Sequence, residues 1–247
     1  MSGLAVLVLP LVLFPARVSA EANCGSARVS VIDIAFCEER EAPVTQAPMP
    51  RGYGLTTPNL PAPEITFDWG SRDIEGQEDK MEFFLKAGSV GFYLSQSVQV
   101  TSSAPDCQGL TKLPADCPNP SAAQCCCAYE GVKAHELTHV ADNSEIFRSS
   151  PKELVEALQK VASGQVDGKH FATEDRPVVL NKNPEEVAAY QRELARKVAE
   201  AARDHHGRLT WAMDERKTAR DSGAGYAQSF GVCPQSIWDH YGIHQFE

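Results

Sequence analysis

Hydrophobic and polar residues alternate in the first half of the chain, which is the pattern of β-strands with one buried face. Residues 27–36 are rich in β-branched side chains, and 64–69 alternate so that Ile65, Phe67 and Trp69 share one face. Residues 92–101 form a third predicted strand. Residues 38–63 carry six prolines and several charges, which predicts a linker or a long surface loop.

The second half shows the spacing of amphipathic helices. One helix is predicted over residues 124–144, with Val132, Leu137 and Val140 as its apolar stripe. A second begins at Ser150-Pro151 and ends at Gly164, and residues 165–182 are irregular. A third begins at Asn183-Pro184 and runs toward Gly207, after which 209–220 are a further helix or its continuation. The order predicts an α+β fold, in which a small β-rich N-terminal part packs on a helical C-terminal part.

The N-terminus has the pattern of an export signal. An apolar run over residues 4–14 precedes Val18-Ser19-Ala20, whose small side chains suit cleavage after Ala20. The run is too short for a stable membrane span, and no other segment is expected to insert in a membrane. We therefore expect a secreted or periplasmic protein with a signal peptide at 1–20, an N-terminal strand and Pro-rich segment at 21–63, and one main domain at 64–247.

The net charge and the cysteine content limit the expected binding partners and the expected cellular compartment. The formal net charge is −10, and it becomes −11 when Arg17 leaves with the signal, so nucleic acid is not expected as a partner. All eight cysteines follow residue 20, and an even number in an exported chain predicts disulfides. Cys107 and Cys117 are the nearest partners for the run 125–127, while a thiolate zinc site is the competing interpretation. The sequence leaves the oligomeric state open.

The most informative motif is the HELTH segment at residues 135–139. On a helix, His135 and His139 lie about 40° apart on one face, so two imidazoles can bind one metal ion. Glu136 follows the first of them and can reach a water bound to that metal. Zn²⁺ acidifies such a water, and a neighbouring carboxylate can accept its proton.

Through His135, Glu136 and His139 this segment resembles the zincin metallopeptidases, over one helix of the chain. The resemblance implies a Zn²⁺ cofactor, a peptide or protein substrate, and hydrolysis of a peptide bond by a zinc-bound water that Glu136 activates. It also implies a third protein ligand elsewhere and a domain in which the HExxH helix packs against a small sheet.

The sequence offers several candidates for the third metal ligand. The metzincin pattern is disfavoured, because Asp142 and Glu145 stand where its Gly and third His would be. A gluzincin-like arrangement would use Glu186, which opens a later helix. Three alternatives remain open, because Glu186 has capping-box spacing from Asn183 and other carboxylates are available. These alternatives are Glu185, Glu174 and Asp142, the last of which also fits a carboxylate that orients an imidazole.

Other polar residues have both a catalytic and a structural interpretation. Tyr190 is a candidate to bind a developing oxyanion. His205 and His206 are expected to cap the end of their helix, and Arg216 and Arg220 to form a salt-bridged face.

Two other functions remain open beside the metallopeptidase. The first is a disulfide-stapled binding module with a structural or vestigial metal site. The second is hydrolysis of an amide bond in the cell envelope, such as a peptidoglycan cross-link.

Overall fold

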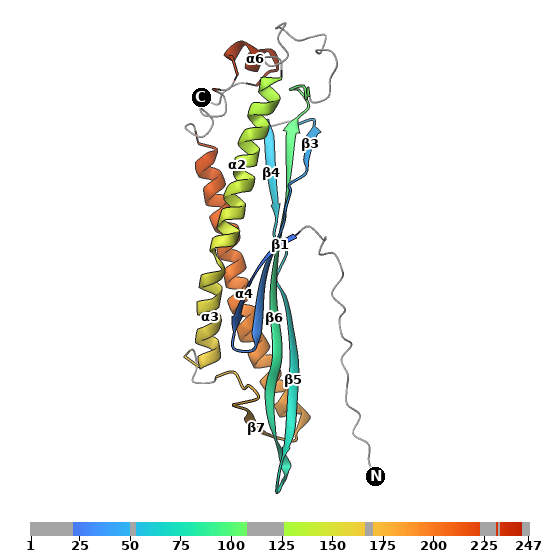
Figure 1. Ribbon diagram of the computed structural model, residues 1–247, viewed down its shortest axis with the longest axis vertical. Helices are drawn as coiled ribbons and strands as arrows, with labels where there is room; N and C mark the ends of the chain where they lie inside the picture. Colours follow the sequence, from blue (N-terminus) through green and yellow to red (C-terminus); the bar gives the residue numbers. More distant parts are fainter. Residues whose placement is uncertain are drawn as a thin grey trace.

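One long strand, β6 (Gln77–Thr101), organises the sheet of the computed structural model, which describes residues 22–49, 53–107, 126–165, 170–222, 231 and 233–243. Every other strand except β1 pairs with β6 (Figure 1). Antiparallel β5 (Glu64–Ile74) and β4 (Gly54–Asn59) pair with successive parts of it. Parallel β2 (Ile32–Glu39) and β3 (Val44–Ala47) and antiparallel β7 (Val178–Asn181) pair with it as well.

The strands are longer and more numerous than the alternation predicts. The predicted strand 27–36 is a hairpin of β1 (Ala22–Val29) and β2, which turns at Ser30, where φ is 55°. Residues 64–69 and 92–101 are parts of β5 and β6, which turn at Gly76 with φ 75°. Positive φ at these two positions is the left-handed conformation that a tight turn needs.

The predicted linker at 38–63 is partly wrong, because it contains β3 and β4 and the end of β2. Its prolines favour a loop locally, but pairing of β3 and β4 with β6 overrides that preference. Pro58 is tolerated because no described strand pairs with the outer side of β4, and proline is accepted on an edge strand.

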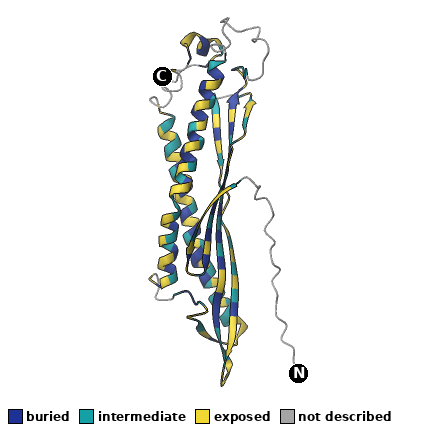
Figure 2. Cartoon of the chain, viewed as in Figure 1, coloured by how far each residue is buried: buried dark blue, intermediate teal, exposed yellow. Residues whose placement is uncertain are grey.

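Helices cover one face of the sheet, which confirms the predicted α+β class (Figure 1). In α2 and α4 the buried residues face the sheet and each other (Figure 2). The four described helices are α2 (Cys127–Ser149), α3 (Pro151–Ser163), α4 (Pro184–Arg220) and α6 (Gln235–His240).

The predicted helix ends agree in part with the structure. Gly164 caps α3 with φ 75°, and Pro184 opens α4 with Asn183 accepting a hydrogen bond from the backbone N–H of Glu185. The helix that begins at Pro184 does not stop at Gly207 but continues to Arg220, so the interpretation of one continuous helix is the right one.

Two apolar clusters lie between the sheet and the helices, and a buried polar network separates them. The larger cluster joins β2 and β6 to α3 and α4, and the smaller one joins the end of β6 to α6 and the start of α2. Between them Asn143 donates to Gln96 Oε1 at 2.9 Å, Gln96 donates to the carbonyl of Val140 at 3.2 Å, and Ser144 donates to Glu38. Buried polar groups that are paired in this way specify one orientation of α2 on the sheet.

Disulfides tie the N-terminal end of α2 to its surroundings. Cys107 pairs with Cys126, which is one of the pairings that the sequence left open. Cys127 pairs with Cys233, and Cys24 pairs with Cys37 across the β1–β2 hairpin. No described cysteine is free, so a thiolate metal site finds no ligand among them. Cys117 and Cys125 lie outside the described residues.

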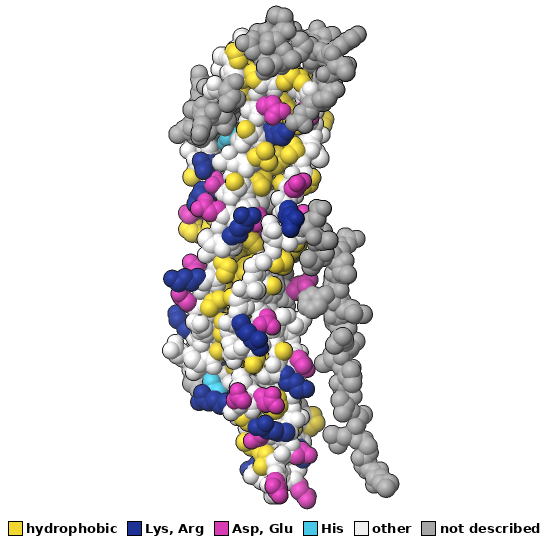
Figure 3. Space-filling model, in the orientation of Figure 1, with side chains coloured by type: hydrophobic (Ala, Val, Ile, Leu, Met, Phe, Trp, Pro, Cys, Tyr) yellow, Lys and Arg dark blue, Asp and Glu magenta, His cyan; other side chains and the backbone are white. Residues whose placement is uncertain are grey.

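The surface mixes charges of both signs. Acidic and basic side chains lie interspersed on the face shown in Figure 3. Among the described residues, no helix combines the length and the apolar composition that crossing a membrane requires. The predicted signal peptide at 1–20 lies outside the described residues.

His205 is not the helix cap that the sequence suggested, because α4 continues beyond it. Its side chain is 1% exposed, and its ring packs roughly perpendicular to the rings of Phe36 and Phe92, which are stacked on each other. Neither ring nitrogen has a hydrogen-bond partner among the described residues. Burial lowers the pKa of His205 to about 4, so the ring is neutral in the folded protein at neutral pH.

We predict that His205 makes the fold sensitive to acid. The pKa of an unfolded histidine is about 6.5 and the folded value is lower, so stability is intact above pH 6.5 and is lost as the pH falls from there toward 4. The loss amounts to about 2 kcal/mol at pH 5. Denaturant unfolding of His205→Leu at pH 7.5 and pH 5 should show a smaller acid loss than wild type. The matched change at exposed His240, His240→Gln, should keep the wild-type loss, and an unchanged loss in His205→Leu would contradict the assignment.

Candidate metal centre

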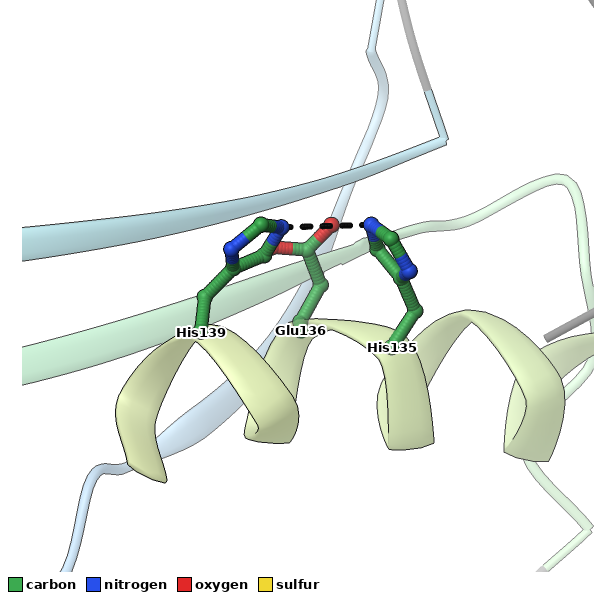
Figure 4. A group of neighbouring side chains, drawn as sticks. All are labelled: His135, Glu136 and His139. Atoms are coloured by element: carbon green, nitrogen blue, oxygen red, sulfur yellow. Dashed lines mark hydrogen bonds between the residues drawn. The ribbon is translucent and has the colours of Figure 1, made fainter. Parts of the chain in front are cut away.

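The HELTH segment lies on α2, and the rotation of this helix decides where each side chain points. At about 100° per residue, His135, His139 and Asp142 fall on the flank of α2 that faces α4, while Glu136 falls on the flank that faces β4. His135, Glu136 and His139 are all buried, and their side chains leave the helix toward the strand above it (Figure 4). Leu137, expected in the apolar stripe, lies on the outer side and is 39% exposed.

The two imidazoles meet a third side chain, Asp221, which follows the last residue of α4. His139 Nε2 lies 2.9 Å from Asp221 Oδ1, His135 Nε2 lies 3.2 Å from the same oxygen, and the two nitrogens are 3.2 Å apart. We call these three atoms the donor triangle. The dashed line in Figure 4 marks its imidazole side.

The donor triangle has the dimensions of three ligands on one face of a tetrahedral Zn²⁺ ion. Ligands about 2.1 Å from a tetrahedral metal are about 3.4 Å from one another, close to the three distances here. His135, His139 and Asp221 would hold the metal through these three atoms. Two neutral imidazoles and one carboxylate are also the donor set that zinc accepts. The residues therefore fit the metal.

Glu136 stands beside the donor triangle and is held by β4. Its ligand oxygen lies within 4.8 Å of the imidazole nitrogens. The hydroxyl of Thr56 lies 2.8 Å from Glu136 Oε2, to which it donates, and 2.9 Å from the backbone oxygen of Glu136. Gly54 leaves the space that the carboxylate fills, because a Cβ atom there would lie only 2.6 Å from Glu136 Cγ.

The two buried acidic side chains of α2, Glu136 and Asp142, have opposite pKa shifts. Burial raises the pKa of Glu136, although the Thr56 hydrogen bond and the two imidazoles oppose that shift. Burial also raises the pKa of Asp142, but the hydrogen bonds and charges of Arg220 and Arg216 outweigh it, so the net shift is downward. Asp142 is therefore a charged partner of the two arginines and not a fourth donor.

The structure does not bring Glu186 to the imidazoles. Glu186 is near the start of the 37-residue helix α4 and Asp221 is at its end, about 50 Å away at about 1.5 Å per residue. Its carboxylate instead accepts a hydrogen bond from Asn181 at 2.8 Å. Glu185 lies at the same end of α4, and the carbonyl of Glu174 accepts from Arg72.

Tyr190 also lies away from the candidate centre. Its hydroxyl accepts a hydrogen bond from the backbone N–H of Ala172, and its ring packs against Trp69 and Phe83. His206 interacts with the carbonyl oxygen of Leu60. Arg216 and Arg220 do form ion pairs, as expected, but with α2 and not with neighbours on their own helix.

Asp221 is the site residue that the sequence did not reveal. It sits in the run Arg220-Asp221-Ser222-Gly223, which is typical of a helix end, so its type alone indicates a cap. The available signal was the length of the third helix: if the helix is continuous from Pro184, its C-terminal end returns alongside α2. The sequence left that continuity open.

Comparisons with known proteins return no match for this chain, whether with family models, curated proteins or solved structures. The assignment of the centre therefore depends on its own geometry.

We predict that zinc retention distinguishes Asp221 from Glu186. Asp221→Ala removes one corner of the donor triangle and should abolish stoichiometric zinc after dialysis against a weak chelator, because a two-imidazole site is incomplete. Glu186→Ala should keep the zinc content of wild type. Metal analysis of both purified variants checks this, and loss of zinc in Glu186→Ala with retention in Asp221→Ala would reverse the assignment.

Proposed function

We propose that this chain is a zinc-dependent hydrolase of amide bonds, with peptides as its substrate class. The observation that carries the proposal is the donor triangle with a buried carboxylate, Glu136, within 4.8 Å of its two imidazole nitrogens. His135, His139 and Asp221 would hold the metal. When bound, Zn²⁺ supplies a Lewis acid that acidifies a coordinated water and polarises a carbonyl oxygen.

Glu136 would act as the general base. Thr56 holds its Oε2 by a hydrogen bond, which leaves Oε1 to accept the proton of the attacking water. The same carboxyl group would then donate that proton to the leaving amine. Because β4 fixes the carboxylate before substrate arrives, little reorganisation is needed during the reaction.

A closed structural metal site is the rival interpretation, and one observation favours it. The Glu136 oxygen lies within 4.8 Å of both imidazole nitrogens, so a modest side-chain movement would make it a fourth ligand. A site with four protein ligands has no position for water and is not catalytic. The two interpretations give opposite results when Glu136 is replaced.

The disulfides indicate the cellular compartment in which the protein would act. Three described disulfides are typical of an oxidising environment, so we propose that residues 1–20 are a signal peptide and that the enzyme acts outside the cytoplasm. A substrate panel should therefore contain both a mixed peptide library and cell-wall peptide fragments. Turnover of only the latter would assign the enzyme to the cell envelope.

We predict that Glu136→Gln retains zinc and loses hydrolysis. The amide is nearly the same shape as the carboxylate but cannot accept the proton, and general-base catalysis contributes about 10²–10⁴-fold. Turnover and zinc content are measured on the same preparation. Loss of zinc in the variant, from a wild-type protein that shows no turnover, would favour the closed structural site, and full activity in the variant would remove Glu136 from the mechanism.

We also predict that Gly54→Ala lowers kcat while zinc content stays unchanged. The new methyl group would overlap the end of the flexible Glu136 side chain, so the carboxylate moves rather than the backbone. Gly91 offers a matched control on β6, because the nearest atom to a Cβ there is 4.0 Å away. Gly91→Ala should keep wild-type kcat, and equal values in the two variants would show that the position of Glu136 is unimportant.

A further inference from the structure

Asp221 occupies an unusual place for a metal ligand, since it follows the last residue of a helix. Its backbone N–H donates to the carbonyl of Lys217 at 2.8 Å, which is the last bond of α4. Helix ends fray more readily than helix interiors. A ligand atom must nevertheless be held to within about 0.5 Å of its productive position. Something besides the helix itself must therefore fix this carboxylate.

The preceding residue, Arg220, is bound firmly to α2. Its Nε donates to Asp142 Oδ2 at 2.7 Å and its Nη2 donates to Asp142 Oδ1 at 3.2 Å, which is a two-point contact. Arg216, one turn earlier, adds a bond to the same carboxylate at 3.2 Å. The Asp142 side chain is 7% exposed, so this ion pair is largely shielded on the acidic side. Paired contacts of this type fix direction as well as distance.

The ion pair and the donor triangle join the same two helices side by side. On α2, His135 and Asp142 are about 20° apart around the axis and about 10 Å apart along it. On α4, Arg220 and Asp221 are consecutive. A slip of α4 by one residue along α2 would move Asp221 by about 1.5 Å and turn it by about 100°, which takes its carboxylate away from the imidazoles. The Arg220–Asp142 contact opposes that slip.

We propose that Arg220 and Asp142 are positioning residues of the metal centre, which set the register of α4 on α2 so that Asp221 reaches the two imidazoles. The inference rests on the proposed metal site. Neither residue contacts the donor atoms of the triangle in any bond described above, so each acts through Asp221. Partners that orient a metal ligand typically change metal affinity by about 10–100-fold when they are replaced.

A long-range charge effect and a positioning effect predict different Zn²⁺ affinities for the variants, which makes the proposal testable. If only long-range charge mattered, removing a cation in Arg220→Gln would strengthen Zn²⁺ binding and removing an anion in Asp142→Asn would weaken it. If position matters, both variants bind Zn²⁺ about 10–100-fold more weakly. Arg220→Lys keeps the charge but loses the two-point contact, and it should also bind more weakly than wild type.

The experiment measures the Zn²⁺ dissociation constant of each full-length variant by competition with a chromogenic chelator at one pH. The matched control is Arg208→Gln. Arg208 also lies on α4, and its Nε is 3.3 Å from Glu153 Oε2 on α3, so the variant removes an ion pair of the same helix. It should keep wild-type affinity for Zn²⁺. Far-UV circular dichroism of the metal-free proteins verifies that each variant is folded. Arg220→Lys, the mildest change, provides the decisive value if Arg220→Gln does not fold.

A double-mutant cycle tests whether Arg220 acts through Asp221. In an Asp221→Asn background, adding Arg220→Gln should cause no further loss of affinity, because the ligand that it positions is already weakened. Additive losses would overturn the proposal, and so would opposite signs for Arg220→Gln and Asp142→Asn. Wild-type affinity in all the single variants would overturn this inference alone, whereas a wild-type protein without Zn²⁺ binding would overturn the proposed function as well.

Discussion

The orientation of α2 on the sheet is the constraint on which the rest of the structure depends. Two apolar clusters supply most of the buried surface, but apolar contacts alone allow a helix to rotate. The buried bonds of Asn143 and Ser144 to Gln96 and Glu38 allow one rotation only, since any other would leave polar groups unpaired. That rotation turns Glu136 toward β4 and the two imidazoles toward α4.

The candidate centre is assembled from segments that are far apart in the chain. Gly54 and Thr56 come from an edge strand, the HELTH residues from the middle of the chain, and Asp221 from the end of the longest helix. Under the proposed function, the strand would provide space for the base, α2 would provide the base and two metal donors, and Asp221 would provide the third donor. Long, nearly straight elements make such an assembly possible, because β6 and α4 both extend over much of the molecule (Figure 1).

The features that depend on local sequence pattern could be predicted from the sequence. The helical spacing of His135 and His139, the Gly164 cap and the start of α4 all depend on neighbours in the chain, and the structure contains them. Prediction from the sequence failed where long-range pairing decides. β4 was missed because prolines surround it and its partner lies some forty residues later, and Asp221 was missed because its meaning depends on a helix–helix register that no local motif records.

The Cys127–Cys233 disulfide closes a covalent loop around all the residues of the candidate centre that α2 and α4 contribute. A single proteolytic cut anywhere between these cysteines would therefore leave two polypeptides that remain one molecule under oxidising conditions. His135 and His139 would stay linked to Asp221 across the nick. The parts of the candidate centre would thus stay together after a first cleavage, and would separate once the disulfide is reduced.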